Sequence, residues 1–356
     1  MKYCFRIHLL LLLALVQFTS CNREDNPNPN IIYSTSGIYL AGTEVSAGRY
    51  KAVYWKNDSI VYLGDSSKNM QATGIFVTDE DVYVLGYEIL GSNNRILYWK
   101  NGIATYLTDG THDAMPSSIL VSNNDVFVSG TENNGSKLVA KYWKNNISVS
   151  LTNGTQNATA NAMCITNGDV YIAGHESNGS HTVATYWKNG NAVRLTDGTG
   201  DAILYSISVD GTNVYTCGHE WNTDWSILNP RLMARYWKNG TAFTLYDSTS
   251  AILSGMATSI FAKNNNVYTT AVQYSGSILN SNTDARFWSN NSSFPLNNAI
   301  SNLLTTALYN KDGDIYIIGN ETVSNNVYKP VLYKNGIEQS VSYTTPSALV
   351  YGLFVK

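Results

Sequence analysis

Short runs of apolar, aromatic and β-branched residues, separated by turn residues, follow one another from about residue 31 to the C-terminus. In one stretch these runs cover residues 118–121, 126–132, 137–143 and 147–152. Runs of this length and composition predict strands, and no helical period of apolar positions occurs after Cys21. The Asn-Gly and Asn-Asp dipeptides between them favour tight hairpins, because asparagine and glycine tolerate positive φ. The pattern predicts an all-β domain.

Two markers show that the strand pattern is repeated. The first is an aromatic pair usually followed by Lys-Asn, and its second aromatic residue recurs at steps of 44, 44, 44, 50, 51 and 45, namely at Trp55, Trp99, Trp143, Trp187, Trp237, Trp288 and Tyr333. The second marker, a short apolar run ending in glycine, keeps the same phase and has Ala271 in the sixth copy. Four predicted strands in each of seven copies match a seven-bladed β-propeller of four-stranded antiparallel blades.

The two ends of the repeat region complement each other. Residues 38–44 correspond to the second strand of a blade, and residues 348–355 to an extra first strand. We therefore expect the N- and C-terminal strands to share one blade and to close the ring, which leaves few exposed sheet edges. Removal of the last ten residues should open it.

The first twenty residues have the features of an export signal. Lys2 and Arg6 precede an apolar stretch at 7–16 that is too short to span a bilayer unaided. Small residues then lead to Cys21, in an order that resembles a relaxed bacterial lipobox with Phe18 in place of the usual leucine. This resemblance implies a signal peptide at 1–20, lipid attachment at Cys21 and anchorage to the outer membrane. The alternative is an ordinary signal peptide with a cysteine near its cleavage site.

Residues 21–30 are predicted to form a polar, extended tether before a propeller at 31–356. Within the tether, residues 23–25 (Arg-Glu-Asp) resemble the short acidic signal of surface-exposed lipoproteins of Bacteroidetes, although a simple charged tether explains them equally well. Lipobox, tether and Tyr-Trp-Lys-Asn-Gly blades together resemble uncharacterised seven-bladed propeller lipoproteins of Bacteroidetes. The resemblance implies a fold and a location, which includes possible exposure at the cell surface, but no activity.

Composition narrows the classes of partner. Charged residues make up 14% of the chain and the net charge is -3, so there is no basic field for binding nucleic acid. The chain is instead rich in amide and hydroxyl side chains and contains 25 tyrosines. Such a surface suits an exported β protein with many turns, and it also suits sugar binding, which uses amides and aromatic faces.

A glutamate follows the marker glycine by two residues in six copies, with Gln273 in the remaining one; the six are Glu44, Glu88, Glu132, Glu176, Glu220 and Glu321. A functional interpretation is a cation site or a pair of catalytic acids at the channel mouth. The favoured interpretation is structural, because a residue present in nearly every blade is expected to hold each blade to the next.

Candidate ligand-binding residues lie on and beside the longest loop between second and third strands, which carries Trp221, Trp225 and Arg231. Variable loops on a rigid scaffold commonly bind ligands, and the two tryptophans could stack on a sugar ring or fold back over apolar surface. His175 and His219 each precede a repeated glutamate. Neighbouring strand positions point to opposite faces, so we do not expect a metal site there.

The sequence contains no nucleophile elbow, metalloprotease helix, phosphate loop or dinucleotide fingerprint, and it indicates no cofactor. Cys164 and Cys217 are predicted to be small core residues, and their spacing does not predict a disulfide.

These observations favour an envelope-anchored binding module that recognises a glycan or a partner protein through its variable loops. One alternative is a glycan-active hydrolase or lyase that uses Glu176, Glu220 and His219 at the ring mouth. Another is a structural subunit of an envelope complex.

Overall fold

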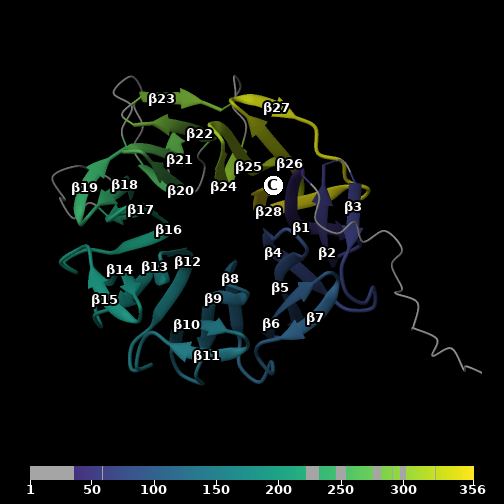
Figure 1. Ribbon diagram of the computed structural model, residues 1–356, viewed down its shortest axis with the longest axis horizontal. Coiled ribbons are helices and arrows are strands. Elements are labelled where there is room, and N and C mark those ends of the chain that lie inside the picture. The colour runs from purple at the N-terminus through teal and green to yellow at the C-terminus, as the bar shows by residue number, and fades with distance from the viewer. Residues whose placement is uncertain are drawn as a thin grey trace, which may run out of the picture. The chain divides into compact units, whose positions relative to one another are not determined.

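Seven β-sheets surround one axis. The computed structural model describes residues 36–57, 59–221, 232–245, 254–275, 282–290, 292–296, 302–324 and 326–356. These residues contain 28 strands in seven four-stranded antiparallel sheets (Figure 1), and no helix among them is long and apolar enough to cross a membrane. The predicted seven-bladed β-propeller is therefore confirmed. Residues 1–30, with the predicted signal peptide, Cys21 and the tether, lie outside the described ranges.

Each blade runs from an inner strand beside the axis to an outer strand at the rim. The first blade contains β28 (Ser347–Val355), β1 (Ile38–Ser46), β2 (Arg49–Lys56) and β3 (Ser59–Tyr62). The second contains β4 (Met70–Val77), β5 (Val82–Leu90), β6 (Asn93–Lys100) and β7 (Ile103–Tyr106). The third contains β8 (Ala114–Ser122), β9 (Asp125–Asn133), β10 (Leu138–Lys144) and β11 (Ile147–Ser150).

The other four blades have the same order. The fourth contains β12 (Ala158–Thr166), β13 (Asp169–Ser177), β14 (Thr182–Lys188) and β15 (Asn191–Arg194), and the fifth β16 (Ala202–Asp210), β17 (Asn213–Trp221), β18 (Leu232–Lys238) and β19 (Thr241–Thr244). The sixth contains β20 (Ser254–Lys263), β21 (Asn266–Ser275), β22 (Asn282–Ser289) and β23 (Ser292–Pro295). The seventh contains β24 (Asn302–Lys311), β25 (Asp314–Ser324), β26 (Val327–Lys334) and β27 (Ile337–Gln339).

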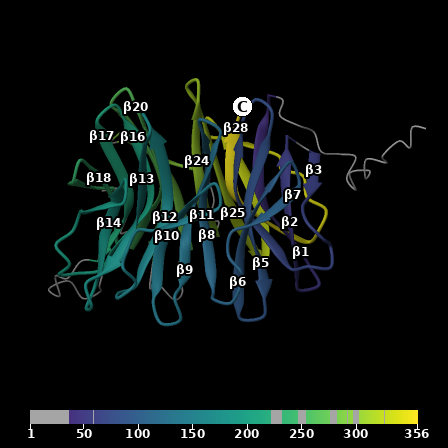
Figure 2. The same ribbon diagram turned by 60° about the horizontal axis from the view of Figure 1, so that its bottom comes forward.

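Successive strands of a blade run in opposite directions, so the connections collect at the two ends of the ring (Figure 2). One end carries the hairpins between first and second strands and between third and fourth strands; we call it the turn face. The other end, the loop face, carries the hairpins between second and third strands and the connections to the next blade. The chain enters the propeller at Ile38, where a second strand begins, so this entry point lies on the turn face.

The marker aromatic residues fill the junctions between blades. Trp99 of the second blade is fully buried in a cluster with Tyr39 and Tyr54 of the first blade. Every other marker aromatic likewise joins a cluster that contains residues of the preceding blade, namely Trp143, Trp187, Trp237, Trp288, Trp55 and Tyr333. A large aromatic ring buries more apolar surface than any other side chain, so one such ring at each junction joins neighbouring blades.

The Lys-Asn part of the marker forms the turn between third and fourth strands. Asn101 has φ of 50°, its Oδ1 accepts a hydrogen bond from Val82 N at 2.9 Å, and its Nδ2 donates to Asp81 Oδ1 at 2.6 Å. Lys100 Nζ lies 2.8 Å from Asp81 Oδ2 and 5.4 Å from the centroid of the Tyr83 ring. The same arrangement recurs around Lys144, Lys188 and Lys334. The motif is therefore a repeated structural turn.

Every inner strand contains one β-bulge, which explains the marker glycine. At each bulge the strand register shifts by one residue, and the bulged residues are Thr73, Ser117, Asn161, Tyr205, Thr258, Thr306 and Tyr351. The bulge pushes an inner-strand carbonyl against the second strand. A Cβ on Gly86 would lie 2.1 Å from Gln71 O and 2.7 Å from Trp99 Cζ3. Side chains are therefore strongly disfavoured at this position, although Ala271 occupies it in the sixth blade.

The inner strands extend further than the apolar pattern indicated. In the third blade the predicted strand at 118–121 is β8, which begins at Ala114. Pro116 and the bulged Ser117 interrupt the apolar alternation, so the sequence pattern missed the first half of the strand.

The termini close the ring as expected. β28 pairs with β1 in the same sheet, from Ile38 opposite Val355 to Val45 opposite Ser347. Val350 N and O are both hydrogen-bonded by the Asn320 side chain of the seventh blade, at 2.8 and 2.9 Å. β28 therefore joins the two ends of the chain.

Candidate functional site

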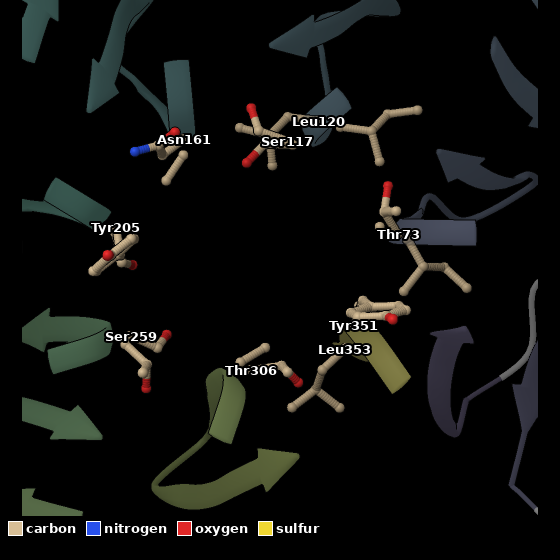
Figure 3. A pocket seen from close by; sticks show the side chains of 18 residues that line it. Thr73, Ser117, Leu120, Asn161, Tyr205, Ser259, Thr306, Tyr351 and Leu353 are labelled. Carbon is tan, nitrogen blue, oxygen red and sulfur yellow. The ribbon is translucent and has the colours of Figure 1, made fainter. Parts of the chain in front are cut away.

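A cavity of about 210 Å³ lies on the propeller axis and is lined by all seven inner strands (Figure 3). We call it the axial cavity. Its lining includes the seven bulged residues, together with small and apolar neighbours such as Gly74, Ser206 and Leu353. No lining residue carries a formal charge. The bulges are thus the feature that brings polar side chains to the centre of the ring.

Most of the small bulged residues use their polar groups to join one blade to the next. Asn161 Nδ2 donates to Leu204 O at 2.8 Å, and Thr306 Oγ1 donates to Val350 O at 3.2 Å. Each acceptor is the residue just before the next bulge. Thr258 Oγ1 lies 2.8 Å from Thr305 Oγ1, which occupies the same position. The ring of bulges therefore has a structural role as well as a place in the cavity wall.

Two bulged residues, Tyr205 and Tyr351, differ from the other five in size and chemistry. They lie on opposite sides of the open centre (Figure 3). Burial raises the pKa of Tyr205 to about 12 and also raises the pKa of Tyr351, so both phenols are neutral at physiological pH. Tyr351 Oη makes no hydrogen bond to the part of the chain that the structure describes, and the contact of Tyr205 Oη is with Met256 Sδ at 3.8 Å. These two side chains are available to a ligand.

The repeated glutamates do not line the axial cavity. Five of them form ion pairs inside their own blades: Glu88 with Arg95, Glu132 with Lys141, Glu176 with Arg194, Glu220 with Arg235, and Glu321 with Lys329. Glu44 is fully buried and accepts hydrogen bonds from the Tyr62 hydroxyl and from Thr344 N and Oγ1. We expected the glutamates to link neighbouring blades. These five ion pairs do not, because both partners of each pair belong to one sheet.

In the third and seventh blades, the residue before the glutamate makes the contact with the next blade instead. Thr131 Oγ1 accepts a hydrogen bond from Ala160 N of the fourth blade at 3.2 Å, and the Asn320 amide bonds both backbone groups of Val350. This position lies on the opposite side of the strand from the glutamate, because side chains alternate along a strand.

His175 and His219 occupy this same position in the fourth and fifth blades. His175 Nδ1 lies 2.9 Å from Thr159 Oγ1, and burial lowers its pKa. His219 is 4% exposed, its ring centroid is 5.5 Å from that of Tyr205, and its Nδ1 has no hydrogen-bond partner among the described residues. Burial, and then the nearby His175, lower the pKa of His219 to about 4, while Asp201 opposes the shift. His219 therefore supports the Tyr205 wall as a neutral side chain.

The low pKa of His219 predicts a loss of stability in acid. In the unfolded chain the imidazole has a pKa of about 6.5, so the unfolded state binds more protons than the folded state between that value and about 4. The free energy of unfolding should thus fall as pH decreases through this window. Above the window, the titration of His219 should add no pH dependence to it. Urea unfolding at pH 7 and pH 4.5 measures the effect. His219→Val, which copies Val272 of the sixth blade, should show a smaller decrease; an equal decrease would contradict the assignment.

The remaining candidates are placed as follows. Trp221 is half-buried at the end of β17, and its backbone N donates to Asp201 O at 2.8 Å. Trp225 and Arg231 lie outside the described residues. Within the described ranges no three histidine, cysteine or acidic side chains are grouped to hold a metal ion. Cys164 and Cys217 are free thiols on neighbouring blades, and burial raises the pKa of both.

Comparison with known proteins supports the fold. No family model and no curated protein matches the sequence. The β-propeller domain of the Trilobed protease from Pyrococcus furiosus superposes with a TM-score of 0.54 at 8% identity, covering 87% of this chain and 96% of that one. The tricorn protease gives a TM-score of 0.52 at 10% identity, with 90% of this chain matched to 35% of the tricorn chain. This chain has the β-propeller fold.

At these identities the similarity extends to the fold alone, and the axial residues have to be interpreted from their own chemistry. The Trilobed protease domain is described as having an open velcro topology, whereas β28 pairs with β1 in this propeller.

The axial residues were not recognised from the sequence, although a signal for them exists. Thr73, Ser117, Asn161 and Tyr205 are spaced by the 44-residue repeat, so they occupy one equivalent position. The bulge at this position results from the pairing of the first and second strands. The repeat spacing alone does not reveal that pairing.

Proposed function

We propose that the protein is a binding module that holds an uncharged, polyhydroxylated ligand, such as one unit of a glycan, in the axial cavity. The observation that carries this proposal is the cavity lining, in which the seven bulged side chains are all polar and uncharged and two are tyrosines. Sugar rings are recognised by hydroxyl and amide hydrogen bonds together with the faces of aromatic rings.

Size and charge limit the ligand further. The cavity volume of about 210 Å³ is below the ~300–1,000 Å³ of pockets that enclose drug-sized molecules, so it suits a single ring. A charged group in the cavity would find no counter-charge in the lining, and burial of an unpaired charge is costly. A neutral sugar unit satisfies both conditions.

Anchorage is the second part of the proposal: lipid attachment at Cys21 and location at the outer membrane, with exposure at the cell surface. The chain enters the propeller on the turn face, so the loop face is the end farther from the tether's point of attachment. This geometry supports capture of a ligand from the loop face. A partner protein docked on that face remains the alternative occupant.

The ion pairs of the glutamates support binding rather than glycan hydrolysis or lysis. Glu176 and Glu220 are paired with arginines, and His219 is buried and neutral. None of these three residues of the catalytic alternative lines the axial cavity. A general acid must reach the glycosidic oxygen of a bound substrate.

The proposal is tested by a screen of the purified protein on an array of neutral saccharides, followed by calorimetric titration of the best hit. A double variant, Tyr205→Phe with Tyr351→Phe, removes two hydroxyls that make no hydrogen bond to a protein oxygen or nitrogen in the described residues. We expect about thirtyfold weaker binding with an unchanged melting temperature, since each of the two lost hydrogen bonds to a ligand contributes about 1 kcal/mol.

Trp221→Ala is the matched control for the loop-face site considered from the sequence. Binding that is lost in Trp221→Ala but retained in the double phenylalanine variant would contradict the axial site. An array with no bound saccharide would contradict the proposed ligand class.

A further inference from the structure

A second cavity lies between the first two blades, on the loop face. Its volume is about 170 Å³, and it is lined by residues of β2, the end of β3, the following connection and the start of β4, with Lys51, Tyr62, Asp65, Ser66, Lys68 and Met70 among them. We call it the Lys51 pocket. It shares no lining residue with the axial cavity, so a ligand there is independent of the function proposed above.

Lys51 differs from Arg95 and Lys329, the equivalent cations of the second and seventh blades, because it has no acidic partner among the described residues. It stands directly opposite Glu44 in the strand register, as Arg95 stands opposite Glu88. Arg95 forms an ion pair with Glu88, but Glu44 is occupied by Tyr62 and Thr344. Closure of the ring therefore takes the glutamate that would otherwise neutralise Lys51, and within the described residues its ammonium group makes no ion pair.

The closing segment also shapes the pocket wall. The Tyr62 hydroxyl is held by Glu44 Oε2 and Thr344 Oγ1, each at 2.8 Å, which fixes the position of the ring. Lys51 Nζ lies 5.9 Å from the centroid of this ring. The pocket thus presents a cation beside a fixed aromatic ring. Tyr62 as a residue is 41% exposed.

The charges around the pocket define the charge of its ligand. Lys51 and Lys68 contribute two positive charges, and Asp65, whose pKa is lowered by hydrogen bonds from Ser67, contributes one negative charge. Lys68 Nζ also forms an ion pair with Glu88 Oε1 at 3.4 Å and donates a hydrogen bond to the Tyr106 hydroxyl at 3.1 Å. Because Lys68 is already paired with Glu88, Lys51 is the lining cation without an ion pair in the described residues, and it favours a ligand with a single negative charge. The Ser66 hydroxyl and Asp65 can bond neutral hydroxyl groups.

We propose that the Lys51 pocket binds an acidic sugar residue, with its carboxylate at Lys51 and Lys68 and its ring against Tyr62. The ammonium groups supply charge-assisted hydrogen bonds to the carboxylate, while the tyrosine face covers the apolar side of the ring. The pocket is large enough for one such residue.

The test is an NMR titration of the purified protein with D-galacturonate, D-galactose and N-acetylglycine. Galacturonate should perturb signals of the pocket residues and bind more tightly than galactose, which lacks the carboxylate, and than N-acetylglycine, which lacks the ring. Lys51→Met should weaken galacturonate binding about tenfold, and added salt should weaken binding to the unaltered protein.

Lys263→Met is the matched control, because Lys263 is likewise exposed and without an ion pair in the described part of the chain. It should leave galacturonate binding unchanged, as should the double phenylalanine variant of the axial cavity. Equal binding of galacturonate by Lys51→Met and by the unaltered protein would overturn the proposed site. Binding of N-acetylglycine as tight as that of galacturonate would overturn the sugar assignment.

Discussion

Deletion of residues 347–356 should abolish the single cooperative unfolding transition of the propeller. The deletion removes β28, the inner strand of the first blade, with its buried side chains Ala348, Val350, Leu353 and Val355. Burial of the three larger ones contributes about 1.5–3 kcal/mol each, so the expected loss approaches the ~5–15 kcal/mol by which whole domains are stable. The deletion also exposes the edge of β1 and removes Val350 from its two bonds with Asn320.

The measurement is a thermal melt followed by circular dichroism, combined with limited proteolysis. The matched control deletes Lys356 alone, which removes its backbone bonds with Gly37 and its bond to Thr78 O but leaves β28 in place. It should lower the melting temperature slightly and retain the single cooperative transition. Addition of a peptide of residues 347–356 should restore part of the lost stability by re-forming the sheet. A truncated protein that melts as the intact one does would show that closure contributes little.

Trp99→Ala should destabilise the domain by about 3–5 kcal/mol, the cost typical of removing a large aromatic side chain from a core. Trp99 is 0% exposed and fills the junction between the first two blades, so truncation leaves a cavity that the rigid sheets cannot close. Trp99→Phe should cost much less, because Trp99 Nε1 has no hydrogen-bond partner in the part of the chain that the structure describes. Urea unfolding gives both values.

The matched control is Ile103→Ala in the same blade. Ile103 is 75% exposed, so its truncation should change the free energy of unfolding by less than about 0.5 kcal/mol. A loss for Trp99→Ala as small as that for Ile103→Ala would mean that the marker tryptophans are not the residues that hold the blades together.

Repetition in the sequence was sufficient to predict the blades. The steps between marker residues, from Trp55 to Tyr333, define seven copies, and the terminal segments correctly predicted a shared blade of β28 and β1. These features are local: strand composition, turn residues and a fixed spacing act within a few tens of residues. The Lys-Asn turn is local in the same sense, because Asn101 bonds Val82 only 19 residues away.

The roles of individual side chains were predicted less well. The repeated glutamates were expected to bridge blades, yet Glu132 pairs with Lys141 of its own sheet and the preceding Thr131 makes the bridge. Both positions recur in every copy, so spacing alone cannot distinguish their roles. The direction in which each points relative to the neighbouring blade decides their roles.

The sequence by itself determined the architecture of this protein, because each blade is specified by its own hydrophobic alternation and turn chemistry. Only the tertiary structure decided which residues face the axis and which charges are neutralised. Tyr205 and Tyr351 lie 146 positions apart in the sequence, and they share the axial cavity because seven bulges turn toward one axis. Among the described residues Lys51 is left without an acidic partner, because Thr344, from the far end of the chain, binds Glu44 when the ring closes.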